Sequence, residues 1–466
     1  MVAENMGIPA VVNTCEEFAK QAHGIFDLGG MPWAQVVYYP GHIDTYDLAT
    51  RETYISELVA PGNEEALTTQ IEAGGAAAVE APETAVAFKG TFDEVNGFFG
   101  GKLWSDGLPV VPPTVEKVEE FLKYTELPAD KAVGPAMEPS FRYATPWTVA
   151  VNGVMCGCRP EYMPVLIAMA QAIADPEFRV QDSGSTPGWE AMTILNGPII
   201  KQLGFNYQSG VLIPGPQANT SVGRFWKMFQ RNVVGIRVDT ATDKGTLGDT
   251  WRVVLAENDD ACGAVGWEPL HVQRGFKPDD NVITMVSVRA VSDGVASNSI
   301  YAENDLEAAE FHLDYIVHWV LRMMEPYECA TLVPRYHLLV MSPVVAAPIT
   351  KGGYSSKADV ERYLLEHSLL TAREFEYHQW LKEGGKPYDL CEEVANGRMP
   401  KEWCESTDPN RMVPVLPPDS QWLVVVSGDP GRNRSLVCRQ NFTQGWPTSK
   451  KIELPANWDE LMEELA

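Results

Sequence analysis

The sequence predicts an α/β protein with mixed and parallel sheets, flanking helices and an incomplete βαβ segment at its N-terminus. Short apolar runs of strand length, at residues 35–39, 282–288 and 422–426, alternate along the chain with longer segments of helical spacing. Hydrophobic residues make up 45% of the chain and charged residues 21%, a balance typical of globular proteins. The length of 466 residues is enough for more than one domain.

The N-terminal segment follows a strand–helix–strand–helix order. Strands are expected at 8–13 and 35–39, and helices at 16–26 and 48–58. This order is typical of a βαβ unit with a parallel sheet, but the segment is short for an independent domain. A small-residue stretch follows at 73–85, so we place a boundary near residue 85 and expect a partial α/β segment at 1–85 and the main α/β domain at 86–466.

The main domain repeats both element types. Strands are expected at 191–196, 282–288, 337–341 and 422–426. Helices are expected at 92–99, 114–124, 160–173, 222–233, 306–324, 355–366, 371–383 and 458–466. Residues 384–418 are rich in turns and charge and are predicted to be a surface insertion.

Two cysteines stand immediately before one of these helices. Cys156 and Cys158 precede Pro160, which is favoured at the first position of a helix. The N–H groups and the positive dipole end of the helix would favour a thiolate at Cys158. The alternative is that both cysteines are reduced, buried, small apolar residues.

A second group of polar residues lies near position 270. Trp267, Glu268, His271 and Arg274 fall within eight residues. An imidazole titrates near neutrality, so His271 is a candidate acid–base group, although a lone histidine is more often a hydrogen-bonded structural residue.

Three loops complete the candidate site. The proline-rich stretch 103–114 carries Asp106 and either walls a pocket or forms a solvated arm. Asn219, Thr220 or Ser221 would cap the helix at 222–233, with Arg224 in its first turn, an arrangement that suits a carboxylate or phosphate. The alternative is an ordinary capped helix with Arg224 solvated at the surface. The glycine loop 427–433, which contains Gly431, follows a buried strand, where α/β proteins place ligands.

Composition argues against several classes of partner. The formal net charge of -27 disfavours nucleic acid and anionic membranes as main partners. No apolar run is long enough for a transmembrane helix, and no secretory signal opens the chain. Eight scattered cysteines form no dense framework, so we expect a cytoplasmic location. The common nucleotide, zinc-protease and serine-hydrolase motifs are absent, so the sequence indicates no cofactor and leaves a metal requirement open.

Six stretches together resemble the large domain of the UGSC family of (seleno)proteins. They are WSDGLPVVPPT, NGVMCGCRPEYMPV, ILNGPI, PGPQANTSVGR, WEPLHVQRGF and VVVSGDPGRN, and they occur in that order over residues 90–445. The first 70 residues, from GIPAVV to QVVYYPGHI, look like the end of the family's smaller domain. That domain carries a selenocysteine- or cysteine-Gly-Ser-Cys motif, which this sequence lacks.

The resemblance implies a partner and a set of site residues. A separate small subunit would supply the Cys/Sec-Gly-Ser-Cys motif and complete the split βαβ unit. The positions that match the family motifs are Cys158, Asn219, Arg224, Glu268, His271, Arg274 and Gly431. Cys156 stands where members more often have a small residue, and Asp249 stands where a histidine is expected. Against the resemblance, these two departures imply a substrate or role different from the family's usual one.

These observations lead to a first hypothesis of function, a subunit of a cysteine-dependent lyase or reductase that acts on a small anionic molecule. Cys158 would be the nucleophile or redox partner, and His271, oriented by Glu268, the general acid–base. The remaining candidates, Asn219, Arg224, Arg274, Trp267, Asp106 and Gly431, would bind substrate. The alternatives are a non-catalytic subunit that shapes the pocket and a metal-dependent hydratase.

Overall fold

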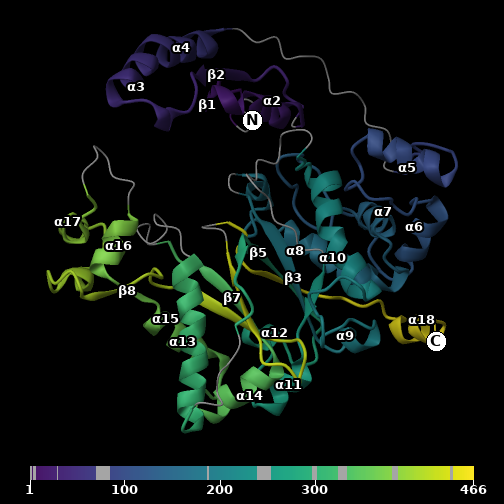
Figure 1. The fold of residues 1–466 in the computed structure, drawn as a ribbon. Helices are drawn as coiled ribbons and strands as arrows, with labels where there is room; N and C mark the ends of the chain where they lie inside the picture. Colours follow the sequence, from purple (N-terminus) through teal and green to yellow (C-terminus); the bar gives the residue numbers. More distant parts are fainter. Residues whose placement is uncertain are drawn as a thin grey trace.

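The computed structural model describes residue 3 and residues 7–28, 30–69, 84–185, 188–238, 253–295, 302–323, 333–379, 387–440 and 444–465 (Figure 1). Asp249, most of the expected linker at 73–85 and the end of the expected helix at 371–383 lie outside these residues.

The N-terminal segment is a βαβ unit, as predicted. β1 (Val11–Cys15) pairs in parallel with β2 (Gln35–Tyr39), and α2 (Ala19–Leu28) connects them after the 3₁₀ helix η1 (Glu16–Phe18). After the 3₁₀ helix η2 (Ile43–Thr45), the chain runs through α3 (Leu48–Tyr54), the π-helical η3 (Ile55–Val59) and α4 (Ala60–Thr68). Asp47 caps α3 by accepting from the Thr50 N–H at 2.8 Å.

The main domain contains two four-stranded mixed sheets. The first has the order β12-β5-β3-β4, and the second has the order β10-β7-β11-β6. β3 and β4 are parallel, as are β10 and β7, while β5, β12 and β11 pair in antiparallel fashion with their neighbours. The bounds of these strands are β3 Glu190–Asn196, β4 Val254–Ala256, β5 Val282–Val288, β6 Ala290–Val291, β7 Tyr336–Met341, β10 Gln421–Val426, β11 Ser435–Arg439 and β12 Thr448–Lys451.

Alternation along the strands places the two sheets face to face between two layers of helices. Met192 and Ile194 of β3 share one apolar cluster with Leu338 and Val340 of β7. The neighbouring residue Leu195 points the other way, into a cluster with α7 (Pro146–Cys156), α8 (Met163–Ile173) and α10 (Gln217–Phe229). Successive side chains of a strand point to opposite faces, so the buried runs form a helix–sheet–sheet–helix arrangement.

The second helical layer covers the other sheet. Leu339 of β7 packs with α13 (Asp305–Met323), α14 (Pro343–Lys351), α15 (Lys357–His367) and α16 (Ala372–His378), which Figure 1 shows on the side away from α8 and α10. The remaining elements of the domain are α5 Phe92–Gly101, α6 Val115–Leu122, η4 Pro160–Tyr162, η5 Val180–Gly184, α9 Ile199–Gln202, η6 Gln230–Val234, α11 Asp259–Ala264, α12 Leu270–Gln273, β8 Leu369–Thr371, α17 Leu390–Ala395, η10 Lys401–Cys404, β9 Met412–Pro414 and α18 Trp458–Glu463.

Several local predictions need correction. The sequence reasoning missed α7, whose last residue is Cys156. α10 begins at Gln217 behind Pro216, so Asn219 and Ser221 lie inside the helix and do not cap it, and Arg224 lies in its second turn. The predicted insertion at 384–418 is partly internal, because β9 pairs with β8 and Val413 is 1% exposed.

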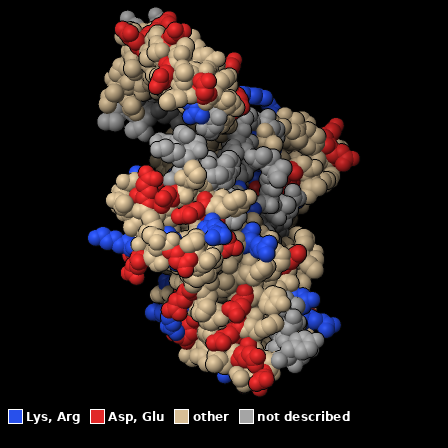
Figure 2. Space-filling view, turned by 60° about the vertical axis from the view of Figure 1, so that its left-hand side comes forward, with Lys and Arg blue, Asp and Glu red and all other residues tan. Residues whose placement is uncertain are grey.

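Acidic side chains are distributed over the face of the molecule shown in Figure 2, with basic ones between them. This distribution agrees with the 63 Asp and Glu against 36 Lys and Arg of the sequence. No helix in the described part of the chain has both the length and the apolar character that a membrane crossing requires.

Candidate functional site

The carboxyl ends of strands from both sheets meet at Glu257. The Glu257 N–H donates to the Leu195 carbonyl of β3 at 3.0 Å, and the Asn258 N–H donates to the Val426 carbonyl of β10 at 2.8 Å. The Ser427 hydroxyl donates to the Ala256 carbonyl at 2.7 Å and completes the junction. Ligand sites of open α/β sheets lie at such carboxyl ends, and here the ends of two sheets coincide.

Glu257 is a buried carboxylate with a full set of donors. The Lys357 ammonium lies 2.8 Å from Oε1, and the Val426 N–H donates to the same oxygen at 2.9 Å. Oε2 accepts from the Leu270 N–H at 2.7 Å and from Asn196 Nδ2 at 2.8 Å. Burial alone would raise the pKa of Glu257, but the charge of Lys357 and these hydrogen bonds hold it below its usual value.

Asp259, two residues further along, has the opposite environment. Its Oδ1 accepts from Asn196 Nδ2 at 2.9 Å and its Oδ2 accepts from the Gly197 N–H at 2.9 Å. Burial raises the pKa of Asp259, and the negative charge of Glu257 raises it further. One amide thus joins two carboxyl groups, of which Glu257 is held ionised and Asp259 is biased toward the protonated form.

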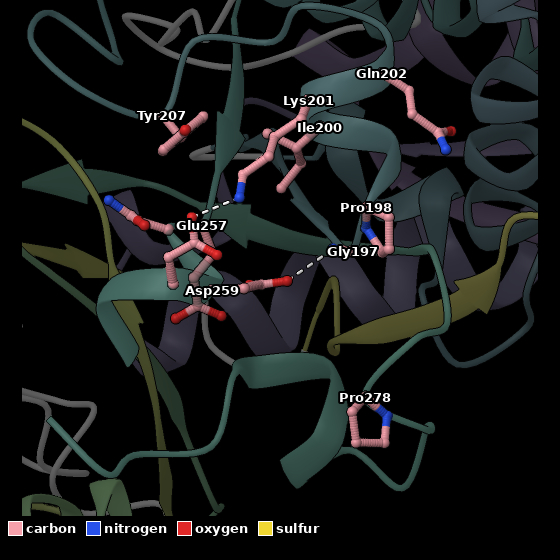
Figure 3. A pocket seen from close by; sticks show the side chains of 11 residues that line it. Gly197, Pro198, Ile200, Lys201, Gln202, Tyr207, Glu257, Asp259 and Pro278 are labelled. Carbon is pink, nitrogen blue, oxygen red and sulfur yellow. Dashed lines mark hydrogen bonds and ion pairs between the residues drawn. The ribbon is translucent and has the colours of Figure 1, made fainter. Parts of the chain in front are cut away.

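A cavity of about 260 Å³ opens beside this pair. Its wall includes Glu257, Asp259, Asp260, Lys201 and Tyr207, which lie in α9, in α11 and in the loops that follow β4 and α9 (Figure 3). The volume suits a small metabolite, since ligand pockets for drug-sized molecules start near about 300 Å³. Of the described residues on the wall, the one cation, Lys201, is paired with Asp260 at 2.5 Å, so the acidic lining favours a neutral or cationic ligand.

His271 lies behind the same wall. It is fully buried in α12, and its Nε2 is 3.2 Å from the carbonyl of Pro278, a residue of the cavity wall. A carbonyl only accepts, so Nε2 carries the proton and Nδ1 is left as an acceptor with no partner among the described residues. The imidazole is close enough to Asp259 that its charge would lower the pKa of that carboxyl.

A second cluster brings together three residues that the sequence analysis selected. Arg224 donates from Nε and Nη2 to the two carboxylate oxygens of Asp106, at 3.0 and 2.6 Å. Cys158 lies near this ion pair and near the Ser221 hydroxyl, and Cys156 is adjacent. Segments 106, 156–158 and 221–224 therefore converge, but Arg224 is already neutralised by Asp106.

The expected thiolate at Cys158 is not favoured. Burial raises the pKa of Cys158 to about 12, against the opposing effects of the Ser221 hydrogen bond and the charge of Arg224. The predicted helix does begin at Pro160, but its first turn is the 3₁₀ helix η4, and Cys158 is 9% exposed between α7 and that turn. Desolvation of the sulfur outweighs the helix dipole, whose effect is small and local.

The other predicted site residues have structural contacts. Asn219 is 1% exposed and bridges Asn206 to the Val254 carbonyl of β4. Trp267 is 2% exposed and donates to the Tyr354 carbonyl at 3.0 Å. Arg274 donates to Ser449 Oγ at 2.6 Å and to the Pro447 carbonyl at 2.9 Å. Arg224, Arg274 and Asn219 therefore do not form a shared anion-binding site.

The expected orientation of His271 by Glu268 is also absent. Glu268 is exposed, and the hydrogen bonds found for the described residues include none between it and His271. Gly431 lies in an exposed loop and donates its N–H to Asp429 Oδ1 at 2.7 Å. That loop contacts Tyr207 of the cavity wall, whose carbonyl accepts from the Gly428 N–H at 3.1 Å.

Sequence reasoning missed four residues of the cavity region, namely Asn196, Glu257, Asp259 and Lys357. A signal was present for Glu257 and Asp259, because acidic residues directly follow a short apolar strand. Lys357 gave no such signal, since a lysine at the start of a capped helix is ordinarily solvated. No group of three or more potential metal-ligating side chains is found in the part of the chain that the structure describes.

Comparison with known proteins identifies no relative, since no family model, no curated protein and no solved structure matches this chain. The fold and the site therefore define the molecule only as an α/β protein with a carboxylate-lined pocket at the strand ends.

Proposed function

We propose that this chain is the pocket-bearing subunit of an enzyme of the lyase type, which adds or removes a proton on a small polar molecule. The observation that carries the proposal is the pair Glu257 and Asp259, joined by Asn196 Nδ2 at the wall of the cavity. Neighbouring carboxyl groups whose pKa values are pushed in opposite directions are the usual mark of an acid–base site.

The two carboxyl groups have different roles in this proposal. Glu257, fixed by Lys357 and two backbone N–H groups, stays ionised and does not exchange protons. Asp259 carries the exchangeable proton, because its pKa is raised toward the working range of an acid–base group. His271 acts against this shift, because the charge of its imidazole would lower the pKa of Asp259, but burial and the charge of Glu257 outweigh it.

The acidic wall changes the expected substrate. The sequence led us to expect a small anionic molecule held by Arg224 and Arg274, but both guanidinium groups are engaged elsewhere. We therefore propose a substrate that is neutral or bears an amine at the end that enters the cavity.

Deuterium exchange tests this function. The protein is incubated in D₂O with a panel of small amino acids, hydroxy compounds and carbonyl compounds, and carbon-bound deuterium is followed by NMR. Asp259→Asn should slow exchange of an active compound by about 10²–10⁴-fold, the usual contribution of a general acid–base group. The wild-type rate should rise with pH through a midpoint above the ordinary Asp range, because the ionised carboxylate is the base.

Two variants make this test decisive. Glu257→Gln removes the negative charge that raises the pKa of Asp259, so the midpoint should move to lower pH. Cys158→Ser serves as the control, because it leaves the cavity wall intact and should retain the wild-type exchange rate. Exchange that survives Asp259→Asn unchanged would remove Asp259 from the mechanism.

The convergence of Cys158, Arg224 and Asp106 favours a second candidate, a thiol-dependent lyase or reductase. Because the pKa of Cys158 is about 12, the structure supports this candidate only if a partner or substrate changes its surroundings. Iodoacetamide labelling tests whether Cys158 is reactive in this chain by itself. We expect Cys158 in the lone chain to react far more slowly than a free cysteine. Rapid labelling at pH 7 would instead support Cys158 as the nucleophile.

A small subunit with a Cys/Sec-Gly-Ser-Cys motif remains part of this second candidate. The support is the two-stranded parallel sheet β1–β2, since a sheet of two strands is marginal by itself and has edges that another chain can extend. In the non-catalytic version, this chain shapes the pocket and the partner supplies the reactive thiol. A stable, active and monomeric chain in size-exclusion chromatography would contradict both versions with a partner.

A further inference from the structure

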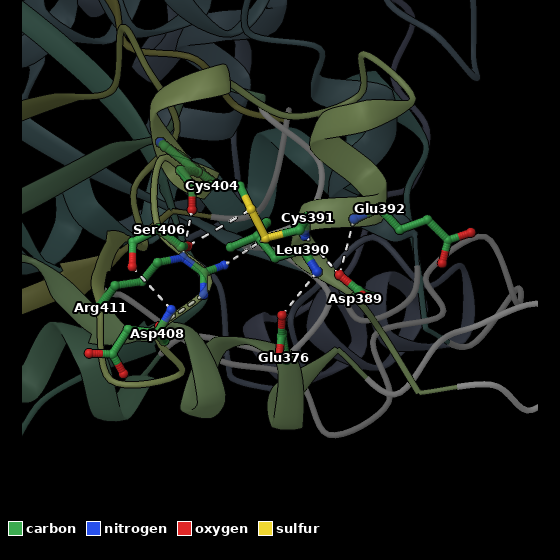
Figure 4. Close-up of a disulfide and its surroundings, with 10 residues drawn as sticks. Glu376, Asp389, Leu390, Cys391, Glu392, Cys404, Ser406, Asp408 and Arg411 are labelled. Carbon is green, nitrogen blue, oxygen red and sulfur yellow. Dashed lines mark hydrogen bonds between the residues drawn. A yellow bond between two sulfur atoms is a disulfide. The ribbon is translucent and has the colours of Figure 1, made fainter.

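Cys391 and Cys404 form a disulfide that neither candidate function uses. The bond joins α17 to η10 across 13 residues, with the two Cα atoms 5.3 Å apart (Figure 4). The scattered cysteines had led us to expect a reducing cytoplasm, where such bonds are rare and are mainly catalytic or redox-sensing. Both cysteines are half-buried, so neither residue is fully enclosed by the described part of the chain.

The two sulfur atoms have unequal surroundings. The Arg411 guanidinium is fixed by the Trp403 carbonyl, which accepts from Nε at 2.9 Å, and by the Asp408 carbonyl, which accepts from Nη1 at 3.0 Å. Its third nitrogen, Nη2, points at Cys391 Sγ from 3.4 Å. Figure 4 shows the guanidinium lying between the disulfide and Asp408.

Among the residues that the structure describes, no comparable donor is found at the Cys404 sulfur. Its sulfur lies 3.9 Å from the Ser406 carbonyl, an acceptor that would destabilise negative charge on it. The acidic groups around the bond act on both sulfurs in the same direction: Asp389 caps α17, Glu376 accepts from the Leu390 N–H at 3.0 Å, and Glu392 and Asp408 flank them. Of the described contacts at the two sulfurs, the one from Arg411 brings a positive charge, and it reaches Cys391 and not Cys404.

From this asymmetry we infer that Cys391–Cys404 is a directional thiol–disulfide exchange site, at which an external dithiol attacks Cys404 Sγ and Cys391 leaves as a thiolate against Arg411. The first thiol of the reagent loses its proton to water, and its sulfur forms a bond to Cys404 Sγ. The disulfide bond breaks, and its electron pair goes to Cys391 Sγ. The second thiol of the reagent loses its proton to water and attacks the reagent's own sulfur in the mixed disulfide. Cys404 is released as a thiolate that takes a proton from water, and the dithiol becomes a disulfide.

The stability of the leaving thiolate decides which of the two sulfurs is attacked. Exchange is faster when the departing sulfur is the more stable thiolate, and a guanidinium within hydrogen-bonding distance stabilises Cys391 selectively. Attack on Cys391 would instead expel the Cys404 thiolate toward a carbonyl oxygen.

The first test uses the wild-type protein, so it does not depend on the folding of a variant. The oxidised protein receives a short pulse of reduced glutathione, is quenched in acid, and is digested for mass spectrometry. Glutathione should be found on the Cys404 peptide in clear excess over the Cys391 peptide. Equal amounts on both peptides, or an excess on Cys391, would overturn the proposal.

The second test measures each thiol by itself. Cys404→Ser leaves Cys391 free, and Cys391→Ser leaves Cys404 free; each is alkylated with iodoacetamide from pH 6 to 10. The midpoint for Cys391 should lie about one pH unit or more below that for Cys404, because an opposite charge at this distance shifts a midpoint by that amount. Adding Arg411→Gln should remove the difference, and Arg411→Lys should retain part of it. If Arg411→Gln leaves the Cys391 midpoint unchanged, the guanidinium has no role and the proposal is wrong.

Discussion

The effect of burial on the pKa of a residue in this protein depends on which charges and hydrogen-bond donors lie beside that residue. Glu257 and Cys158 are both buried, and desolvation raises the pKa of each. Glu257 also receives the charge of Lys357 and backbone donors, so its pKa falls below the usual value. Cys158 receives one hydroxyl and a guanidinium that is already bound to Asp106, so its pKa stays high. Glu257 therefore remains charged, because its cation, Lys357, pairs with it directly, whereas the cation near Cys158 is already paired with Asp106.

The buried ion pair allows a prediction about stability. Lys357→Met leaves the Glu257 carboxylate buried without its cation, so it should lower the free energy of unfolding by about 3–5 kcal/mol. The double variant Glu257→Gln, Lys357→Met removes both charges and should recover much of that loss. Urea denaturation of the wild type, both single variants and the double variant closes the cycle. A double variant as unstable as Lys357→Met alone would show that packing, and not the unpaired charge, sets the cost.

At the scale of elements, two adjacent helices place the cysteines. α7 begins after a Thr145 capping box, and its C-cap is Gly157, which has φ 77°. The Gly157 N–H donates to the Val154 carbonyl and the Cys158 N–H to the Gly153 carbonyl, as in a helix end closed by a left-handed residue. The chain then turns directly into η4 and α8, so the position of Cys158 follows from the ends of these helices.

The contact between α7 and its neighbours can be tested with two glycines. A methyl group at Gly153 would lie 2.6 Å from Leu166 Cδ1 and 3.0 Å from Phe121 Cε1, whereas one at Gly97 of α5 would meet nothing within 4 Å. Gly97→Ala should stabilise the protein by about 0.5–1 kcal/mol through helix propensity. Gly153→Ala should destabilise it by about 1–3 kcal/mol, because overpacking outweighs the same propensity gain. Thermal unfolding of the matched pair measures both, and equal signs would contradict this packing.

At the scale of the whole molecule, the main domain builds its core without the N-terminal segment. The three apolar clusters of the described residues contain no residue before Val95. The N-terminal βαβ unit instead exposes apolar side chains, including Leu48 at 71% and Ile8 at 53%.

Truncated chains test whether the main domain folds without the N-terminal segment. A chain of residues 86–466 should fold and retain the melting temperature of the full protein within a few degrees, about the effect of 1 kcal/mol or less. A chain of residues 7–69 should lack cooperative unfolding by itself, since a two-stranded sheet is marginal in water. Circular dichroism on heating measures both. Loss of cooperative unfolding in the longer fragment would mean that the N-terminal segment contributes to the core.

The sequence by itself determined the α/β class and many elements. β2 and β5 have the predicted bounds, and β1 and β2 are parallel, as expected. These features depend on side chains close together in the chain, through alternation and helical spacing.

Only the tertiary structure decided which polar residues meet and which carry charge. Lys357 and Glu257 are 100 residues apart in sequence, and Asp106 and Arg224 are 118 apart. The motif residues Asn219, Trp267 and Arg274 have the chemical groups of a binding site, but the fold uses those groups for internal hydrogen bonds. A residue type shows what a side chain can do, whereas its pKa and its free donors depend on burial and on distant partners, which local sequence does not contain.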